Sequence, residues 1–314
     1  MDLNIILFSD LNDKTNTSAI AQLKSALLHK GIVGIQGVPD FENKSRAFVN
    51  AARKFSALQD AVKQKYAPNR DAGETEGYEL GAEWFKNNAG EWQVDDKKTS
   101  YYAAIPDSVR NKWPNDVELK TPYLELGELI FNTGKWLLNA IGMNEMLGLQ
   151  HDGLVGCGRM LHYLKESDAT NENPIWCGAH LDHGVFTALI PAYYFCEGTE
   201  IAEPEEAGLY IVPTGGEQFE KIHASQKDVL LFQVGEFGQL ISNDEIKATK
   251  HMVRKAKGNI ERFSFAVFYS PEEMLVNSQS ILTEDARHKQ HQLPDGRISY
   301  SSWANASLDR YRVR

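Results

Sequence analysis

The feature that most constrains this chain is residues 178–184, Gly-Ala-His-Leu-Asp-His-Gly. In an extended segment His180 and Asp182 point to the same face, with their Cα atoms about 7 Å apart, because side chains alternate along a strand. An imidazole nitrogen and a carboxylate oxygen on one face form half of a site for a small cation. His251, far downstream, can complete a set of two histidines and one carboxylate, which leaves coordination positions open for reactants.

A second group of polar residues follows His251 in a segment with strand character. Alternation over residues 262–268 places Arg262, Ser264 and Phe268 on one face. An arginine buried without a partner is costly, so Arg262 on an inward face requires an anion. Its guanidinium suits a carboxylate, and Ser264 adds a hydroxyl donor beside it. The alternative is an arginine at a barrel rim, solvated or paired with an internal glutamate.

The order His-X-Asp, a long gap, His and then Arg-X-Ser resembles the Fe(II)/2-oxoglutarate-dependent dioxygenases. The resemblance is closest to the branch that includes isopenicillin N synthase and the plant hormone and flavonoid oxygenases. Residues 180–187 (HLDHGVFT) are similar to its metal-binding strand, and residues 159–163 (RMLHY) to its strand with a co-substrate tyrosine. Leu161 departs from the asparagine that the branch commonly has there. The likeness covers roughly residues 5–270.

The resemblance implies an oxygenase that uses Fe(II), 2-oxoglutarate and O2, and that oxidises a small-molecule substrate with release of succinate and CO2. It implies metal ligation by His180, Asp182 and His251, and 2-oxoglutarate binding by Arg262, Ser264 and Tyr163.

Two further residues are candidates for the substrate side. Gly77-Tyr78 stands where the family often has a Gly-Tyr pair at the substrate entrance, with an ordinary packed tyrosine as the alternative. Phe268 is expected to form a wall of the substrate site, with plain core packing as the alternative. In the family, the segment corresponding to 272–314 often lies over the mouth of the active site.

Two other functions stay open on the motifs alone. The first is an oxidase of the same fold that does not use 2-oxoglutarate, as in isopenicillin N synthase, since that enzyme shares the Arg-X-Ser motif. The second is a non-catalytic or zinc-binding cupin-like module. The identity of the substrate, the choice between hydroxylation and desaturation, cyclisation or ethylene formation, and the oligomeric state are not fixed by any motif.

The pattern of short β-rich segments predicts a mainly β fold with added α-helices. We expect a mostly helical region over 1–150, a double-stranded β-helix (a cupin-like jelly roll) over 151–271, and a C-terminal segment over 272–314. Residues 195–207 are rich in glutamate and are predicted to form a surface loop. The predicted strands are 156–164, 175–180, 185–194, 208–213, 228–234, 238–241, 248–254 and 262–269.

Composition narrows the class of protein. The formal charge of −10 argues against a nucleic-acid partner, which would need clustered lysines and arginines. No segment approaches the roughly 18 apolar residues of a membrane span. Cys157, Cys177 and Cys196 form no Cys-X-X-Cys pair, which predicts reduced thiols in a cytoplasmic protein. Cys177 is three residues before His180, so alternation predicts that it faces away from the metal site.

Overall fold

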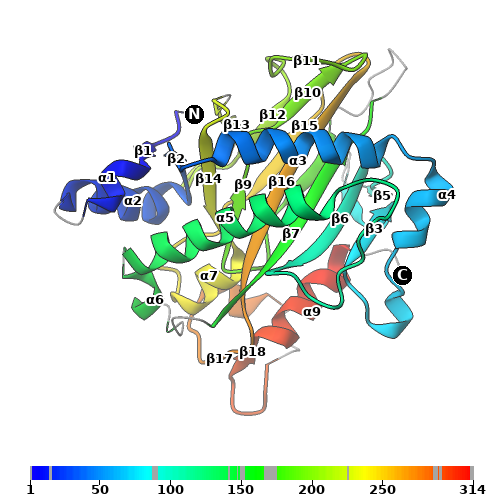
Figure 1. Cartoon of the computed structure of the whole chain (residues 1–314). Helices are drawn as coiled ribbons and strands as arrows, with labels where there is room; N and C mark the ends of the chain where they lie inside the picture. The colour runs from blue at the N-terminus through cyan, green and yellow to red at the C-terminus, as the bar shows by residue number, and fades with distance from the viewer. Residues whose placement is uncertain are drawn as a thin grey trace.

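Two β-sheets packed face to face form the centre of the molecule (Figure 1). The computed structural model describes residues 2–13, 16–86, 91–140, 142–146, 148, 153–165, 175–224, 226–285, 289 and 292–311. Within these residues the larger sheet has the order β1-β2-β14-β9-β16-β7-β6-β3, with β10 and β11 attached through β16, and the smaller sheet has the order β13-β12-β15-β8. The protein is therefore mainly β, with helices and a jelly-roll core, as the sequence predicts.

The strands of the larger sheet are β1 (Ile5–Leu7), β2 (Ile32–Gln36), β3 (Gly77–Leu80), β6 (Lys98–Ile105), β7 (Leu154–Tyr163), β9 (Phe186–Leu189), β10 (Tyr193–Cys196), β11 (Thr199–Ile201), β14 (Val229–Val234) and β16 (Ile260–Pro271). The smaller sheet contains β8 (Ile175–His180), β12 (Gly208–Ile211), β13 (Glu220–Lys221) and β15 (His251–Arg254). Two short pairs complete the strands: β4 (Trp84–Lys86) with β5 (Trp92–Val94), and β17 (Leu275–Val276) with β18 (Ile298–Ser299).

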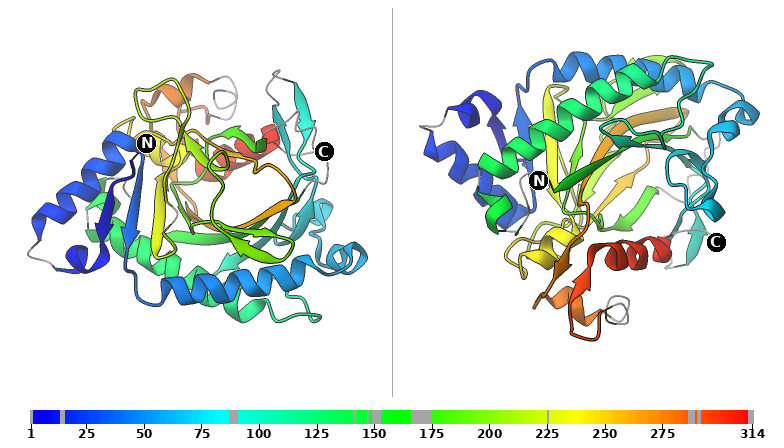
Figure 2. Two further views of the ribbon diagram at one scale, coloured as in Figure 1. Left: turned by 90° about the horizontal axis from the view of Figure 1, so that it is seen from above. Right: turned by 60° about the horizontal axis from the view of Figure 1, so that its bottom comes forward.

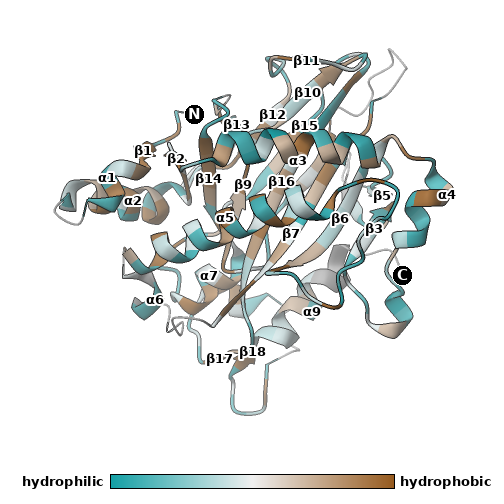
Figure 3. Ribbon diagram, viewed as in Figure 1, coloured by the Kyte–Doolittle hydropathy of each residue, from teal (hydrophilic) through white to brown (hydrophobic). Residues whose placement is uncertain are grey.

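Two long helices, α3 (Phe41–Ser56) and α5 (Lys120–Ala140), cover the outer face of the larger sheet (Figure 1). The ring of Phe265 on β16 lies 4.5 Å from that of Phe48 and 4.8 Å from that of Tyr123. Gly134 lets α5 approach closely, because a Cβ atom there would lie 2.2 Å from the Tyr269 hydroxyl. Both helices carry hydrophobic and hydrophilic residues (Figure 3), as expected of helices with one face on a sheet.

Shorter helices lie at the two ends of the sheets (Figure 2). At one end are α1 (Phe8–Asn12) and α2 (Thr17–Lys30), next to β1 and β2. At the other end is α9 (Tyr300–Tyr311). Within the described residues, none of the helices combines the length and apolar character that crossing a bilayer requires. The remaining helical segments are α4 (Asp60–Lys63), α6 (Met143–Met146), α7 (Glu236–Ile241) and the 3-10 turns η1 (Gln64–Tyr66), η2 (Arg70–Ala72) and η3 (Ile281–Glu284).

The strand predicted over 238–241 is wrong, because this segment belongs to helix α7. Phe237, Leu240 and Ile241 recur at helical spacing, and all three are buried. The amide of Glu236 at the start of α7 donates to the carbonyl of Asp182 at 2.6 Å. The helix therefore begins directly beside the predicted metal-binding segment.

The surface loop predicted over 195–207 is also partly wrong, because its first half is a β-hairpin. Strands β10 and β11 pair with Cys196 opposite Thr199, which leaves a two-residue turn. Both turn residues, Glu197 and Gly198, have positive φ values of 50° and 84°. This is the conformation that matches the twist of hairpin strands, and it explains how a glutamate-rich segment extends the sheet.

Candidate metal and co-substrate site

His180, Asp182 and His251 lie together between the two sheets. One possible ligand atom from each of the three residues lies within 4.8 Å of the others. His180 ends β8 and His251 begins β15, and the two residues are directly opposite in the antiparallel pair. The Nε2 atoms of His180 and His251 lie 3.6 and 3.8 Å from Asp182 Oδ1. The smaller sheet thus brings together residues that are far apart in the sequence.

The hydrogen bonds of both imidazoles favour metal ligation. Nδ1 of His180 donates to the carbonyl of Gly178 at 2.8 Å, and Nδ1 of His251 donates to that of Thr249 at 2.9 Å. A carbonyl can only accept, so each Nδ1 carries a proton and each Nε2 is the nitrogen that faces Asp182 and can bind a metal. Two such nitrogens and a carboxylate facing one point form a donor set suited to a divalent cation.

The three groups also have altered acid strengths. Burial and the neighbouring His180 lower the pKa of His251 to about 4. Burial alone would raise the pKa of Asp182, but the two histidines lower it below its usual range. Burial alone would lower the pKa of His180, but Cys177 and Asp182 raise it well above its usual value. Near pH 7 the carboxylate is therefore ionised and His251 is neutral, and a metal that binds His180 displaces a proton from it.

A β-bulge gives Cys177 a different orientation from the predicted one. His251 is opposite His180 and Val253 is opposite Cys177, so three residue steps on β8 match two on β15. The extra residue reverses the alternation of side chains. Cys177 therefore lines the same cavity as His180, and the prediction that it faces away from the site is wrong.

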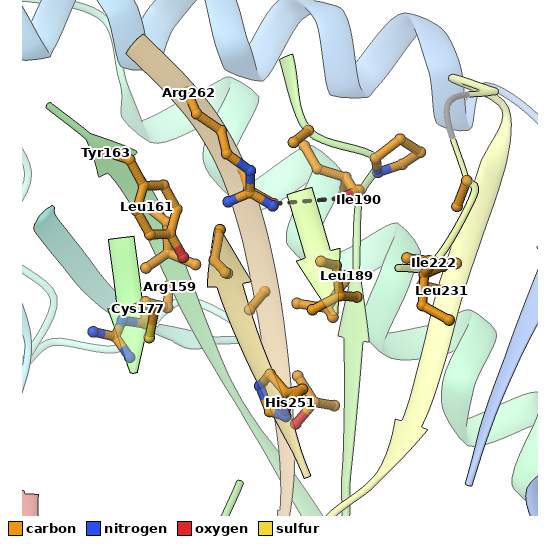
Figure 4. A pocket seen from close by; sticks show the side chains of 18 of the residues that line it. Arg159, Leu161, Tyr163, Cys177, Leu189, Ile190, Ile222, Leu231, His251 and Arg262 are labelled. Atoms are coloured by element: carbon orange, nitrogen blue, oxygen red, sulfur yellow. Dashed lines mark hydrogen bonds between the residues drawn. The ribbon is translucent and has the colours of Figure 1, made fainter. Parts of the chain in front are cut away.

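The cavity in which the triad lies has a volume of about 770 Å³, including space open to solvent at its mouth. Its walls come from both sheets, and Figure 4 shows His251 at one end and Arg262 at the other. Apolar side chains such as Leu161, Leu189, Ile222 and Leu231 separate these polar ends (Figure 4).

Arg262, Ser264 and Tyr163 meet at the end of the cavity away from the triad. Arg262 on β16 is opposite Tyr163 on β7, and Ser264 is opposite Leu161, so all four side chains lie on the cavity face. Ser264 Oγ donates to the carbonyl of Ile190 at 3.3 Å. The guanidinium carbon of Arg262 lies 4.7 Å from the centre of the Tyr163 ring, a cation–π distance.

The Arg262 guanidinium has few partners for a buried cation. The residue is 6% exposed. Its Nε donates to the Tyr194 hydroxyl at 3.3 Å, and among the described residues no acid forms an ion pair with it. A buried arginine in this state is costly unless an anion binds to it. Arg262 is therefore not a solvated arginine at the rim of a barrel, which was the alternative from the sequence.

A buried ionic network forms the wall next to Cys177, and no sequence motif indicated it. Arg159 Nη2 lies 3.0 and 2.9 Å from the two carboxylate oxygens of Glu83. Lys98 Nζ lies 2.9 Å from Glu83 and 2.7 Å from Asp95. Arg159 and Lys98 both line the cavity. The alternation of Arg159 with Tyr163 along β7 was the only sequence signal for an inward arginine.

The two substrate-side candidates from the sequence, and His162 beside Tyr163, have clear positions. Phe268 lines the cavity. Tyr78 does not line it, because it is 1% exposed and its ring packs in the core, 5.8 Å from that of Phe55. His162 faces away from the cavity, where its Nε2 lies 2.9 Å from Glu261 and its ring stacks on Phe263. Adjacent residues on β7 thus have opposite environments, as alternation predicts.

The chain is similar in structure to several solved proteins. A full-length Neurospora crassa protein solved in complex with alpha-KG has a TM-score of 0.72 at 19% identity, covering 98% of this chain and 95% of that one. A putative 2OG-Fe(II) oxygenase family protein from Caulobacter crescentus has a TM-score of 0.71 at 19% identity, covering 98% of both chains. JOX2 in complex with 2OG, Fe and JA has a TM-score of 0.70 at 16% identity, covering 98% of this chain and 85% of that one.

Sequence comparisons give one positive result. A comparison with curated proteins found no match. Residues 156–271 match the model of the family described as the 2OG-Fe(II) oxygenase superfamily. This segment runs from β7 to the end of β16 and contains the triad together with Arg262 and Ser264. The part of the chain that forms the candidate site, residues 156–271, thus belongs to the 2OG-Fe(II) oxygenase superfamily.

Proposed function

We propose that this protein is an Fe(II)- and 2-oxoglutarate-dependent oxygenase that hydroxylates or otherwise oxidises a small molecule, with release of succinate and CO2. The observation that carries the proposal is the Arg262 guanidinium. It is buried, it has no acidic ion-pair partner among the described residues, and it faces the cavity that also contains the triad. A dicarboxylic acid can satisfy both ends of this cavity at once.

In this proposal His180, Asp182 and His251 hold Fe(II), which when bound supplies the redox chemistry that activates O2. The protein contributes the geometry of the ligands. Carbonyl groups fix both imidazole rings, and Gln233 Nε2 donates to Asp182 Oδ2 at 2.8 Å. These contacts hold the ligand atoms in place before the metal arrives.

Arg262, Ser264 and Tyr163 bind the distal carboxylate of 2-oxoglutarate. The guanidinium offers paired N–H donors and neutralises the charge. The bond from Ser264 to Ile190 is long at 3.3 Å, so the hydroxyl can exchange it for a carboxylate oxygen. The phenol of Tyr163 adds a donor, and its ring flanks the guanidinium. Apolar walls exclude water from the reaction space.

The substrate occupies the part of the cavity next to Phe268 and Arg159. The lining of this part suits a small molecule, because Phe268 offers an aromatic ring for stacking and Arg159 offers a guanidinium that can bind a polar group. The Neurospora crassa protein has been solved with thymine and JOX2 with JA, both small molecules, which supports this size class. The branch that includes isopenicillin N synthase stays a prediction from the sequence.

The test is substrate-free turnover of 2-oxoglutarate labelled at its first carbon. The wild-type protein with Fe(II) and O2 should release labelled CO2 and succinate slowly. Asp182→Ala should abolish metal retention and turnover. Arg262→Ala should retain the metal and raise the 2-oxoglutarate concentration needed for half-maximal rate, because only the distal contact is lost.

Calorimetric binding of 2-oxoglutarate and the kinetics of the variants separate the alternatives. Metal binding without any 2-oxoglutarate binding by calorimetry would favour an oxidase of this fold that does not use it. An Arg262→Ala variant with unchanged kinetics would contradict the role of this residue.

A further inference from the structure

A chain of polar contacts continues behind Arg262, beyond the residues that the proposed function uses. Arg262 Nε donates to the Tyr194 hydroxyl at 3.3 Å, and that hydroxyl donates to Glu203 Oε2 at 3.2 Å. Glu203 Oε1 lies 3.0 Å from Lys221 Nζ. Glu203 also lines the cavity, although it belongs to the glutamate-rich segment that the sequence assigned to the surface.

The direction of each bond in this chain is fixed by chemistry. A carboxylate only accepts, so the single proton of the Tyr194 hydroxyl points to Glu203. Burial raises the pKa of Tyr194, so the phenol keeps this proton. The lone pairs of its oxygen then face Nε of Arg262. These hydrogen bonds use Nε of Arg262 and leave its Nη1 and Nη2 atoms for a ligand in the cavity.

The strand pairing holds the guanidinium from two sides. Arg262 is opposite Tyr194 on β10 and opposite Tyr163 on β7. Its guanidinium carbon lies 6.0 Å from the centre of one ring and 4.7 Å from that of the other. Figure 4 shows the side chain beside Tyr163, reaching into the cavity toward Ile190.

The position of Glu203 is itself fixed. Lys221 Nζ donates to the carbonyls of Pro204 and Glu205 at 2.9 and 2.8 Å, which anchors it beside the carboxylate. Gly208 has a φ of 113°, and a Cβ atom there would lie 2.9 Å from Glu203 Oε1. The absence of a side chain at Gly208 therefore makes room for the carboxylate.

We propose that Tyr194 and Glu203 are positioning residues for the co-substrate. They orient Arg262 so that its Nη1 and Nη2 atoms meet the distal carboxylate, and they thereby set the preference for 2-oxoglutarate over 2-oxo acids without that group. This inference rests on the proposed function. Neither residue touches the co-substrate's reacting atoms, because both act through Arg262.

The test is calorimetric binding to the full-length protein loaded with Mn(II), with two probes. One probe is 2-oxoglutarate, and the other is 2-oxopentanoate, which has a methyl group in place of the distal carboxylate. Tyr194→Phe should weaken 2-oxoglutarate binding roughly tenfold, because a hydrogen bond to a charged group is lost, and leave 2-oxopentanoate binding unchanged.

Tyr193→Phe is the matched control. Tyr193 is the neighbouring residue on β10, and its hydroxyl is buried without a hydrogen-bond partner among the described residues, so this variant should bind both probes as the wild type does. Glu203→Ala should weaken 2-oxoglutarate binding selectively as well. Glu203→Gln should stay within about threefold of wild type, because its amide oxygen still accepts from Tyr194.

The outcomes separate this inference from the function on which it rests. Wild-type protein that binds Mn(II) but not 2-oxoglutarate would overturn the proposed function and this inference with it. Wild-type binding with Tyr194→Phe equal to Tyr193→Phe would overturn the inference alone. An equal loss for both probes would also overturn it, because it would show a general structural role.

Discussion

Gln233 lies beside the triad on β14 and is fully buried. Its Nε2 donates to Asp182 Oδ2 at 2.8 Å and lies 3.5 Å from His251 Nδ1. Asp182 Oδ1 faces the two imidazoles, so the bond from Gln233 determines which carboxylate oxygen is free for a metal. No motif identified this residue, because its partner is 51 positions away.

We expect Gln233→Leu to weaken Fe(II) or Mn(II) binding by about 10- to 100-fold, as is typical when the partner of a metal ligand is removed. Equilibrium dialysis of the purified protein measures the change. Gln36→Leu on the adjacent strand β2 is the matched control, because Gln36 bonds to Asp228. Equal metal affinity in the two variants would show that Gln233 does not support the site.

At the scale of the elements, ion pairs attach the β4–β5 hairpin to the larger sheet. Glu83 precedes the hairpin and Asp95 follows it, and both carboxylates contact Lys98 on β6. Glu83 also contacts Arg159 on β7. The side chains of Lys98 and Asp95 are 4% and 3% exposed. The ion pairs that attach the hairpin are therefore buried, and the folded protein already includes the cost of removing these charges from water.

Lys98→Ala should lower the free energy of unfolding by about 3–5 kcal/mol, because it removes the ion-pair partner of the buried Asp95 carboxylate. Urea denaturation followed by circular dichroism measures this. The control is Lys44→Ala, which removes a partly exposed pair with Glu125 and should cost about 0–1 kcal/mol. Equal midpoints for the two variants would rule out the buried network as a stabilising element.

At the scale of the whole molecule, the C-terminal helix α9 is joined to the core. Trp303 is 1% exposed, and its ring lies 6.3 Å from that of Phe237 on α7. The Tyr300 hydroxyl donates to Ser270 Oγ at 2.6 Å, at the end of β16. Helix α7 in turn begins at the carbonyl of Asp182. The position of residues 272–314 over the mouth of the active site stays a prediction, but the packing of α9 links this segment to the site.

Trp303→Ala should lower the free energy of unfolding by about 3–5 kcal/mol, as large-to-small changes in a core do. Thermal unfolding should keep a single transition at a lower midpoint. Trp92→Ala, at a residue that is 46% exposed, should cost less. A main transition that does not move in Trp303→Ala would indicate that α9 is a separable cover rather than part of the fold.

Local sequence patterns were enough to predict which side chains on several strands face the cavity. Alternation along strands placed Arg262, Ser264 and Phe268 on the cavity face, and the structure agrees in each case. The predicted meeting of His180 and Asp182 is also found, although Asp182 lies just after the end of β8. These predictions are sound because the period of two in a strand is a property of the backbone and needs no knowledge of distant residues.

The tertiary structure alone decided the rest. A bulge in β8 reversed the alternation and turned Cys177 inward. Chain folding brought Glu203 behind Arg262, Glu83 to Arg159 and Gln233 to Asp182. Such contacts join residues that only packing brings together, and a buried charge or amide takes whichever partner the folded chain places within reach. The spacing of residues along the sequence therefore could not predict these contacts.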